Sequence, residues 1–396
     1  MNLLINTDSL TPPLTGIGNY TFHLLKELLS IQQDDEGLKR IDCISGKEFI
    51  SASAALGKCN LAEQNFDSEK PRISTLRRIV RRIPLAYRTR QALHDLRLLQ
   101  QRHQYRHFLY HEPNFILKAH PGPCVATIHD LSFIHYPQHH PAERVAWMHG
   151  NLKKTLERAD QLITVSKLVR QELIDFLGVP ADRIQTTYLG VDADFHPRTS
   201  TETQGLMDRY QLTHGSYVLF VGTLEPRKGV DLLLDAWASL PVPIRKNYKL
   251  VLAGASGWRN AELLERIQRL EAHGEICWLR YIPQDDLPIL YAGAAAFTFP
   301  SIYEGFGLPV LEAMASGVPV VCTAGTSMAE FAAEAPLLFE VGNSEEFSEQ
   351  LRTLLEDDKL REQHSTRGLE RANHFSWRRF AHETLAIYRT VDGCST

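Results

Sequence analysis

Two charged, glycine-bearing segments hold the residues of this 396-residue chain that are best suited to chemistry on a phosphate-containing ligand. In the first, residues 301–312, Glu304 lies in a loop after a predicted strand, and a helix is expected to begin near Gly307. The N–H groups and the dipole of a helix N-terminus favour an anion such as a diphosphate. A carboxylate beside a phosphate is electrostatically unfavourable, so we expect Glu304 to hold hydroxyl groups of a sugar.

The second segment, residues 220–229, places two adjacent cations at another strand end. Arg227 and Lys228 follow Gly222 in the loop before a predicted helix. Fixed positive charge is unfavourable for a helix N-terminus, but it suits the neutralisation of a diphosphate leaving group. Both segments fall in the same half of the chain at corresponding strand ends. This coincidence supports the interpretation of both segments as anion sites.

The first half of the chain offers a histidine and a glycine turn. His129 directly follows the predicted strand 125–128, where a loop residue is expected to face a ligand. Gly16 and Gly18 lie between a strand and a helix, but the third glycine of the G-x-G-x-x-G pattern is missing. Nicotinamide binding is therefore unsupported.

The elements around these residues alternate between short apolar runs and helical patterns, which is typical of parallel α/β layers. We expect two Rossmann-like, doubly wound domains that face a cleft, with ligands bound beyond the carboxyl ends of the strands. The expected domains are residues 1–197 on the acceptor side, 216–374 as the donor-binding domain and 375–396 as a closing helix. Residues 197–215 are expected to be a linker. The predicted strands are 3–5, 107–109, 125–128, 162–165, one ending at 189, 217–222, 249–253, 276–279, 296–300 and 318–322.

The composition is that of an ordinary soluble globular protein, with 43% hydrophobic and 23% charged residues. No apolar run approaches the roughly 18 residues that span a bilayer. The first residues indicate a buried strand rather than a signal peptide. The six cysteines include no C-x-x-C pair, which argues against a zinc site and a disulfide framework. These features favour a cytoplasmic, reduced, metal-free enzyme.

The net charge of −4 hides a basic block at residues 70–106, where eleven Lys or Arg stand against one acidic residue. At about 100° per residue, the apolar residues of its first part share one face of a predicted helix. The opposite face carries Arg77, Arg78, Arg81 and Arg82. A basic amphipathic helix can lie on an anionic bilayer, so we expect docking to the inner-membrane surface. The alternative is a helix that packs on the first domain with solvated arginines.

The combination of motifs resembles the retaining family 4 glycosyltransferases of GT-B fold, over nearly the whole chain. The motifs are Glu304-x7-Glu312 with Ala-Met-Ala-Ser-Gly-Val-Pro-Val-Val, Gly222 to Gly229, and His129-Asp-Leu-Ser-Phe. The chain is most similar to the bacterial mannosyl- and rhamnosyltransferases that build lipopolysaccharide O-chains. The resemblance implies that mannose or D-rhamnose passes from a GDP-sugar to a growing, lipid-linked surface glycan. It implies no metal, no cofactor and no nucleic-acid partner.

The resemblance also assigns roles to individual residues. His129, Glu304 and Lys228 would be catalytic, with His129 and Glu304 at the donor sugar and Glu312 at the nucleotide ribose. The remaining donor-binding residues would be Gly16, Gly18, Gly222, Arg227, Tyr281, Ile282, Gly305, Phe306, Gly307 and Leu308. One departure is at 327–330, where the family often has a proline before the position of Glu330.

Two other function classes stay open at this point. The first is a catalytically silent subunit that docks pathway glycosyltransferases at the membrane, but it would be expected to lose Glu304, His129 or Lys228. The second is a nucleotide-sugar epimerase on the same fold, which needs no acceptor. For the transferase, we expect a peripheral position on the cytoplasmic face of the inner membrane and contact with other glycosyltransferases of the pathway.

Overall fold

The computed structural model describes residues 1–46, 48–68, 102–257 and 260–393. The chain divides into two compact units, Met1–Leu189 with Trp377–Thr396, and Gly190–Ser376. Arg77, Arg78, Arg81 and Arg82 lie outside the described residues, so membrane docking through them stays a prediction.

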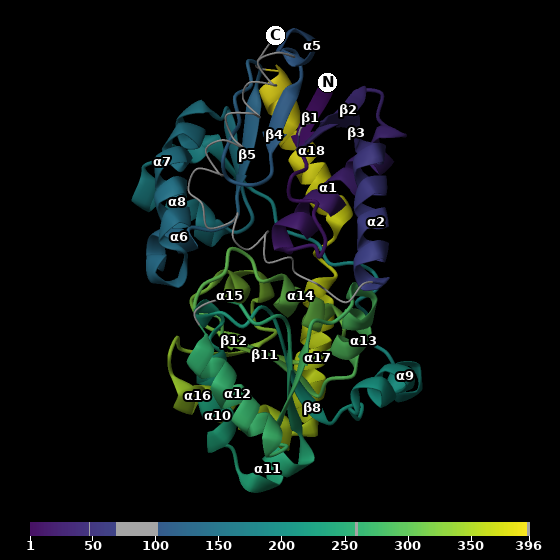
Figure 1. The fold of residues 1–396 in the computed structure, drawn as a ribbon, viewed down its shortest axis with the longest axis vertical. Helices are drawn as coiled ribbons and strands as arrows, with labels where there is room; N and C mark the ends of the chain where they lie inside the picture. The colour runs from purple at the N-terminus through teal and green to yellow at the C-terminus, as the bar shows by residue number, and fades with distance from the viewer. Residues whose placement is uncertain (47, 69–101, 258–259, 394–396) are drawn as a thin grey trace. The chain divides into compact units, whose positions relative to one another are not determined.

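The first unit is built on a seven-stranded sheet with the order β3-β2-β1-β4-β5-β6-β7, in which only β3 is antiparallel to its neighbour. Helices α6 to α8 lie on one side of this sheet, and α1, α2 and α18 lie on the other (Figure 1). The strands are β1 Asn2–Asn6, β2 Arg40–Ser45, β3 Glu48–Ser51, β4 Leu109–Glu112, β5 Cys124–Ile128, β6 Gln161–Thr164 and β7 Ile184–Thr186. The helices are α1 Gly16–Gln32, α2 Ala52–Ser68, α5 Arg102–Tyr105, α6 Ser132–His135, η1 Pro137–His139, α7 Ala142–Arg158, α8 Lys167–Leu177, η2 Ala181–Arg183 and α18 Trp377–Gly393.

The second unit is built on a six-stranded parallel sheet with the order β10-β9-β8-β11-β12-β13. The chain adds β9 and β10 on one side of β8, and then continues with β11, β12 and β13 on the other side. The point between β8 and β11 where the strand order switches is where doubly wound sheets bind ligands. The strands are β8 Tyr217–Val221, β9 Lys249–Ala253, β10 Ile276–Arg280, β11 Ala296–Phe299, β12 Val320–Thr323 and β13 Leu337–Phe339. The helices are α9 Ser200–Tyr210, η3 Pro226–Lys228, α10 Val230–Ser239, α11 Val242–Asn247, α12 Ala261–Ala272, η4 Gln284–Asp286, α13 Leu287–Ala292, α14 Leu308–Ala315, α15 Ser327–Ala332, α16 Ser344–Glu356 and α17 Asp358–Ala372.

Two sequence predictions about the elements are wrong. Residues 197–215 are not a linker, because α9 occupies 200–210 and Thr199 forms a capping box with Glu202 at its start. The unit boundary lies instead between Leu189 and Gly190. A strand was expected over 107–109, but β4 runs from Leu109 to Glu112. The prediction ended too early because the buried polar residues His111 and Glu112 interrupt the apolar pattern.

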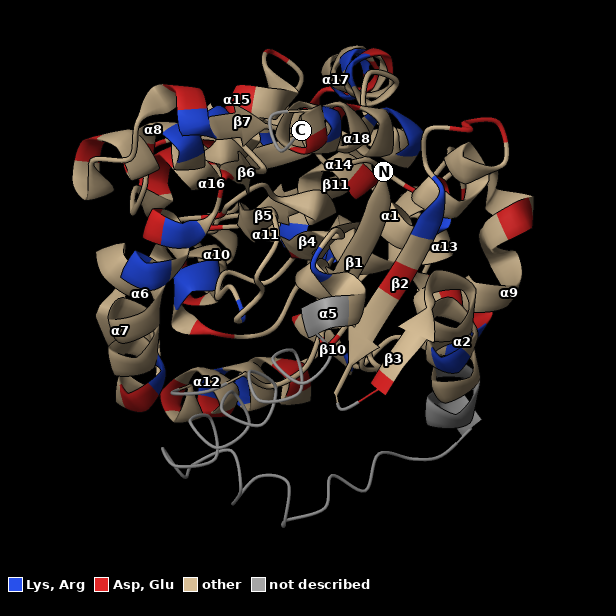
Figure 2. Ribbon diagram, turned by 90° about the horizontal axis from the view of Figure 1, so that it is seen from above, with Lys and Arg blue, Asp and Glu red and all other residues tan. Residues whose placement is uncertain are grey.

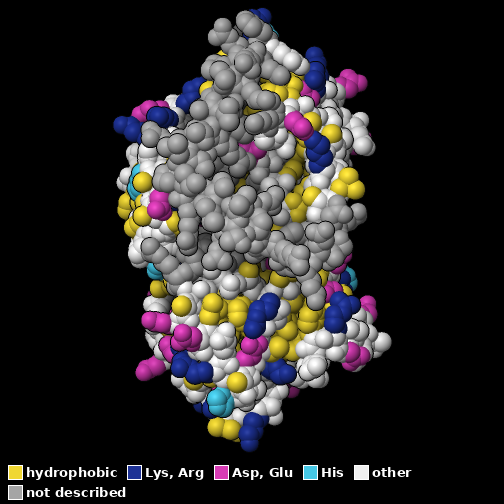
Figure 3. Space-filling view, in the orientation of Figure 1, with side chains coloured by type: hydrophobic (Ala, Val, Ile, Leu, Met, Phe, Trp, Pro, Cys, Tyr) yellow, Lys and Arg dark blue, Asp and Glu magenta, His cyan; other side chains and the backbone are white. Residues whose placement is uncertain are grey.

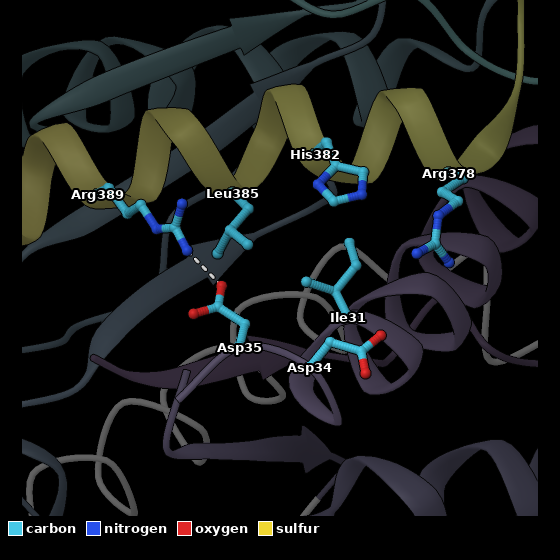
Figure 4. A pocket seen from close by; sticks show the side chains of 7 residues that line it. All are labelled: Ile31, Asp34, Asp35, Arg378, His382, Leu385 and Arg389. Carbon is cyan, nitrogen blue, oxygen red and sulfur yellow. Dashed lines mark hydrogen bonds and ion pairs between the residues drawn. The ribbon is translucent and has the colours of Figure 1, made fainter. Parts of the chain in front are cut away.

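Helix α18 returns to the first unit and packs along α1. The indole of Trp377 stacks on the imidazole of His23, with ring centroids 4.4 Å apart. Near the end of α1, Arg389 points to Asp35 and forms an ion pair with it (Figure 4). Side chains of α18, of the end of α1 and of the loop that follows α1 line a pocket of about 180 Å³ there.

Charged side chains of both signs lie together on the helices. The ribbon of Figure 2 marks both basic and acidic residues along α12, and Figure 3 shows charged and apolar side chains interspersed over the described part of one face. Among the described residues, the structure contains no helix of sufficient length and hydrophobicity to cross a bilayer.

The close approach of two loops gives a first test of this fold. Gly229 has φ +68°, and a Cβ atom there would lie 2.2 Å from the carbonyl oxygen of Pro300. Gly274 has a similar φ of +74°, but a Cβ atom there would meet nothing within 4 Å. We expect Gly274→Ala to cost about 1–2 kcal/mol of unfolding free energy through backbone strain. Gly229→Ala should cost clearly more, and equal costs by chemical denaturation would contradict the close approach.

Candidate functional site

The carboxylate of Glu304 forms an ion cluster with the two predicted cations. The Lys228 ammonium donates to Glu304 Oε1 over 2.6 Å, and Arg227 Nη1 lies 3.1 Å from the same oxygen. Ser301 Oγ donates to this oxygen over 2.5 Å. Three charged residues from the two predicted anion sites, Glu304, Arg227 and Lys228, therefore meet at one carboxylate.

The loops after β8 and β11 bring this cluster together. These two strands are neighbours in the sheet, and both loops leave from their carboxyl ends (Figure 1). The N–H of Ile302 donates to the carbonyl oxygen of Arg227 over 3.0 Å, and Gly229 makes room for Pro300. The Lys228 ammonium lies 5.0 Å from the centroid of the Phe299 ring. Backbone contacts between the loops thus set the spacing of the charges.

Glu304 is ionised in spite of its burial. Only 9% of the residue is exposed, and burial alone would raise its pKa. The nearby charges of Arg227 and Lys228, with hydrogen bonds from Lys228 and Ser301, outweigh this effect and lower the pKa to about 2. The site therefore presents a fixed carboxylate at neutral pH.

Arg227 is held by several protein acceptors. Its guanidinium donates to Glu225 Oε1 over 2.8 Å and to the carbonyl oxygen of Tyr303, in addition to its pairing with Glu304. Its side chain is only 12% exposed. This geometry favours Arg227 as the group that orients Glu304. Lys228, whose ammonium has three donors, is better suited to share Glu304 with a bound anion.

The start of α14 follows the cluster. Gly307 has φ +111°, and a Cβ atom there would lie 2.5 Å from Met328 Cγ, so only glycine fits. Ser327 Oγ is within hydrogen-bonding distance of the carbonyl oxygens of Glu304 (2.7 Å) and Phe306 (2.8 Å). Gly305 is buried, and Leu308 begins the helix. Pro309 has no N–H, and the N–H of Val310 donates to the carbonyl oxygen of Gly307 over 3.0 Å. The N–H groups at the very start of the helix suit an anion.

The Phe306 side chain points into the protein. Its ring stacks on Phe331 with centroids 4.4 Å apart, and it is 4% exposed. Any contact of Phe306 with a ligand would therefore come from its backbone.

Glu312 lies apart from the ion cluster, one turn into α14. Part of the Glu312 residue is accessible to solvent. Burial by the surrounding protein nevertheless raises the pKa of its carboxyl group to about 7, although the Tyr291 hydroxyl acts to lower it. Two carboxylates of one motif thus have opposite properties. Glu304 is a stabilised anion, and Glu312 binds a proton readily.

The residues predicted to meet a base follow β10. Tyr281 is 39% exposed, whereas Ile282 is buried. Arg280 has φ +60° and its guanidinium lies 3.6 Å from the centroid of the Trp278 ring. Gly222 directly follows β8, and a Cβ atom on Gly254, which follows β9, would lie 2.0 Å from the carbonyl oxygen of Gly222. Of the predicted pair, Tyr281 offers the larger side-chain surface.

The remaining predicted residues belong to the first unit. His129 is 8% exposed, and its Nε2 donates to the carbonyl oxygen of Pro113 over 2.7 Å. Burial lowers its pKa, although the bond to Pro113 and the charge of Asp130 act in the opposite direction. Gly16 opens α1, where a Cβ atom would meet nothing within 4 Å, and Gly18 is closely approached by Leu14 and Ser9.

Sequence reasoning missed several polar side chains that hold the site. Glu225 fixes Arg227, Ser301 donates to Glu304, and Ser327 ties the loop to α15. Glu225 lies within a recognised motif and could have been found there. In the part of the chain that the structure describes, no three His, Cys, Asp or Glu side chains gather as a metal-binding group.

Comparisons with known proteins agree over both units. Residues 210–371 match the group 1 glycosyl transferases, and residues 59–195 match glycosyltransferase family 4. The chain is 37% identical over 391 residues to O-antigen chain mannosyltransferase B of Escherichia coli, covering 99% of this chain and 100% of that protein.

Solved structures share the fold at low sequence identity. WaaG, a glycosyltransferase involved in lipopolysaccharide biosynthesis, has a TM-score of 0.69 at 16% identity, over 98% of this chain and 99% of that one. An Anabaena protein in complex with UDP and glucose has a TM-score of 0.70 at 18% identity, over 98% and 99% of the two chains.

The raised pKa of Glu312 predicts a pH-dependent effect of its replacement. Between its ordinary value of 4.5 and about 7, the folded protein holds a proton that the unfolded chain has lost. The unfolding free energy contributed by this group therefore falls as pH rises through that interval. Glu312→Gln should become more stable relative to the parent from about pH 5 to pH 8, measured by chemical denaturation without donor.

Glu345, an exposed residue in the first turn of α16, provides the matched control. The Glu345→Gln variant should keep a nearly constant difference from the parent across this range. A constant difference for Glu312→Gln as well would show that Glu312 is ionised in the folded protein throughout.

Proposed function

Because this chain belongs to the group 1 and family 4 glycosyltransferases and has their GT-B fold, we propose that it transfers mannose from GDP-mannose to a growing, lipid-linked O-antigen chain. In this proposal, transfer retains the anomeric configuration of the donor and needs no metal ion. The observation that carries it is the ion cluster of Glu304, Lys228 and Arg227 at the switch point of the second sheet.

The choice of mannose rests on the relative that matches nearly the whole chain. That protein is named as an O-antigen chain mannosyltransferase, and the alignment leaves almost no part of either chain unmatched. This supports a similar substrate here over the D-rhamnose alternative. A lipid-linked acceptor would be reached at a membrane surface, which is the proposed place of action.

The charges suit departure of a nucleoside diphosphate. When the bond between the sugar carbon and the phosphate oxygen breaks, negative charge develops on the diphosphate. The Lys228 ammonium and the N–H groups at the very start of α14 would stabilise this charge, as a divalent ion does in other enzymes. Glu304, ionised beside Lys228, would accept hydrogen bonds from sugar hydroxyls and so fix the sugar next to its leaving group.

Other residues would complete the donor site. Glu312 would accept hydrogen bonds from the ribose, Tyr281 would contact the base, and His129 of the first unit would contact the donor sugar. The N–H groups of residues 306–308 and the Gly16–Gly18 turn would approach the phosphates.

The test is NMR analysis of the product formed from GDP-mannose and a synthetic lipid-linked acceptor that ends in mannose. The proposal predicts a new mannosyl linkage with the anomeric configuration of the donor. An inverted linkage would overturn the retaining mechanism. An isomerised nucleotide sugar without acceptor would indicate the epimerase, and release of neither product across GDP- and UDP-sugars would indicate the silent subunit.

Replacement of Lys228 tests the leaving-group site. Removing one preorganised charge of this kind typically lowers the rate on the order of 10²–10³-fold, so Lys228→Ala should lose that much transfer per folded molecule. Its side chain is 13% exposed and ion-paired, so a lower melting temperature is also expected. Arg227 and Ser301 remain on Glu304 and should keep the unit folded.

Lys246 of α11, an exposed lysine of the same unit, is the control. The Lys246→Ala variant should keep parental activity and melting temperature. If Lys228→Ala lost stability but transferred mannose at the parental rate per folded molecule, Lys228 would be a structural residue.

Metal removal tests the role assigned to fixed positive charge. With Lys228 and backbone N–H groups at the diphosphate, transfer in excess chelator should proceed at the untreated rate. The measurement is initial rate with chelator, and again after adding Mg²⁺ or Mn²⁺. Transfer that is lost in chelator and restored only by metal would contradict the proposal.

A further inference from the structure

The first unit contains a chain of buried hydrogen bonds that the donor site does not use. It begins on α18, where the Tyr388 hydroxyl lies 2.6 Å from His111 Nδ1 on β4. His111 Nε2 lies 2.9 Å from Thr127 Oγ1 on β5, and Thr127 Oγ1 lies 2.8 Å from the Tyr20 hydroxyl on α1. We call Tyr388, His111, Thr127 and Tyr20 the buried chain.

All four residues of the buried chain have no exposed surface. Buried polar groups are costly unless they are hydrogen-bonded, and apolar residues of the same shape would serve packing equally well. The elements that carry them come from the start of the chain (α1), from two consecutive strands (β4 and β5) and from its C-terminal helix (α18), and all pack within one unit (Figure 1). A satisfied polar network of this kind specifies one arrangement of side chains.

The buried chain ends against His129. The Tyr20 ring lies edge-on to the His129 imidazole, with centroids 4.8 Å apart and an interplanar angle of 88°. Phe380 of α18 packs against the Tyr20 ring at 4.9 Å. On the imidazole itself, Nε2 donates to the Pro113 carbonyl oxygen. The Phe115 ring also packs against His129, with centroids 5.7 Å apart, so the position of the His129 ring depends on Pro113 and on the rings of Tyr20 and Phe115.

The protonation states of His111 and His129 indicate that the buried chain orients side chains and does not carry a proton. Burial, and to a lesser degree His129, lowers the pKa of His111 to about 3, so His111 is neutral at pH 7. A neutral imidazole has one donor and one acceptor nitrogen, and Tyr388 and Thr127 occupy one each. For His129, a carbonyl oxygen can only accept, so Nε2 carries the proton and Nδ1 is an acceptor.

We propose that Tyr388 and Tyr20 are positioning residues that, through His111 and Thr127, fix the His129 imidazole for contact with the donor sugar. This inference rests on the proposed function, in which His129 contacts that sugar. It gives the C-terminal helix a role in catalysis beyond packing. The helix holds one end of a hydrogen-bonded chain whose other end sets the orientation of a reacting-site ring.

Tyr388→Phe removes one hydroxyl and keeps the ring. Mutations in a network that links two sites typically weaken the coupling between them by an amount that corresponds to about 3- to 30-fold. We expect Tyr388→Phe to lower kcat by this factor, with little change in the KM for donor. The control is Tyr110→Phe on β4, since Tyr110 is equally buried but donates to Glu112 over 2.9 Å instead. The control should keep the parental kcat. Equal kcat for Tyr388→Phe and the parent would overturn the proposal.

A double-variant cycle separates positioning from general loss of structure. If Tyr388 acts through His129, Tyr388→Phe should have no further effect on kcat in a His129→Ala background. The same fold-loss in both backgrounds would overturn the proposal. If His129→Ala kept the parental kcat while Lys228→Ala lost activity, the positioning proposal would also be overturned. The proposed transferase function would then still stand.

A measurement without substrate makes the proposal independent of transfer. In NMR of the ligand-free protein, Tyr388→Phe should shift the imidazole nitrogen signals of His129, and Tyr110→Phe should not. Unshifted His129 signals in Tyr388→Phe would overturn the inference. Absence of transfer by the parent, in contrast, would refute the proposed function and leave the NMR result to decide the positioning role.

Discussion

A buried carboxylate that stays ionised is the constraint on which the second unit depends. Burial alone would raise the pKa of Glu304, and the two cations of the neighbouring loop reverse that effect. Removing a charge from water is costly unless it is paired and hydrogen-bonded. The loop that carries Arg227 and Lys228 must therefore lie against the loop that carries Glu304, and each loop stabilises the other.

The parallel sheet makes this contact possible. Strands β8 and β11 are neighbours, although they are far apart in the chain, so their carboxyl ends deliver the two loops to one edge. Glycine then allows the loops to approach where a side chain would collide, at Gly229 against Pro300 and at Gly307 against Met328. The loop that carries Glu304 leads directly into α14. The ion cluster thus follows from strand order and from two glycines, and the anion site proposed here is built on it.

Much of this arrangement could be predicted from the sequence, because charge type and strand ends are local signals. The two motifs predicted that Glu304 and the pair Arg227 and Lys228 lie at corresponding strand ends of one domain. The ion pairs among them were not predicted. The contributions of Ser301 and Ser327 could not be predicted, since a hydroxyl shows its partner only after the loops are folded together. Helix α9 was not predicted because its apolar side is small, with Leu206 and Met207 as its buried hydrophobic residues. The bounds of β4 were missed because His111 and Glu112 are polar, and polar residues are rare in a buried strand.

Calorimetric titration with GDP, GMP and guanosine tests the central claim most directly, namely that the ion cluster receives the second phosphate of the donor. In the parent, GDP should bind at least about tenfold more tightly than GMP, because a charge-assisted hydrogen bond to the added phosphate is worth that much. In Lys228→Ala this advantage should largely disappear, while the affinity for guanosine stays unchanged. An undiminished preference of Lys228→Ala for GDP over GMP would contradict the account.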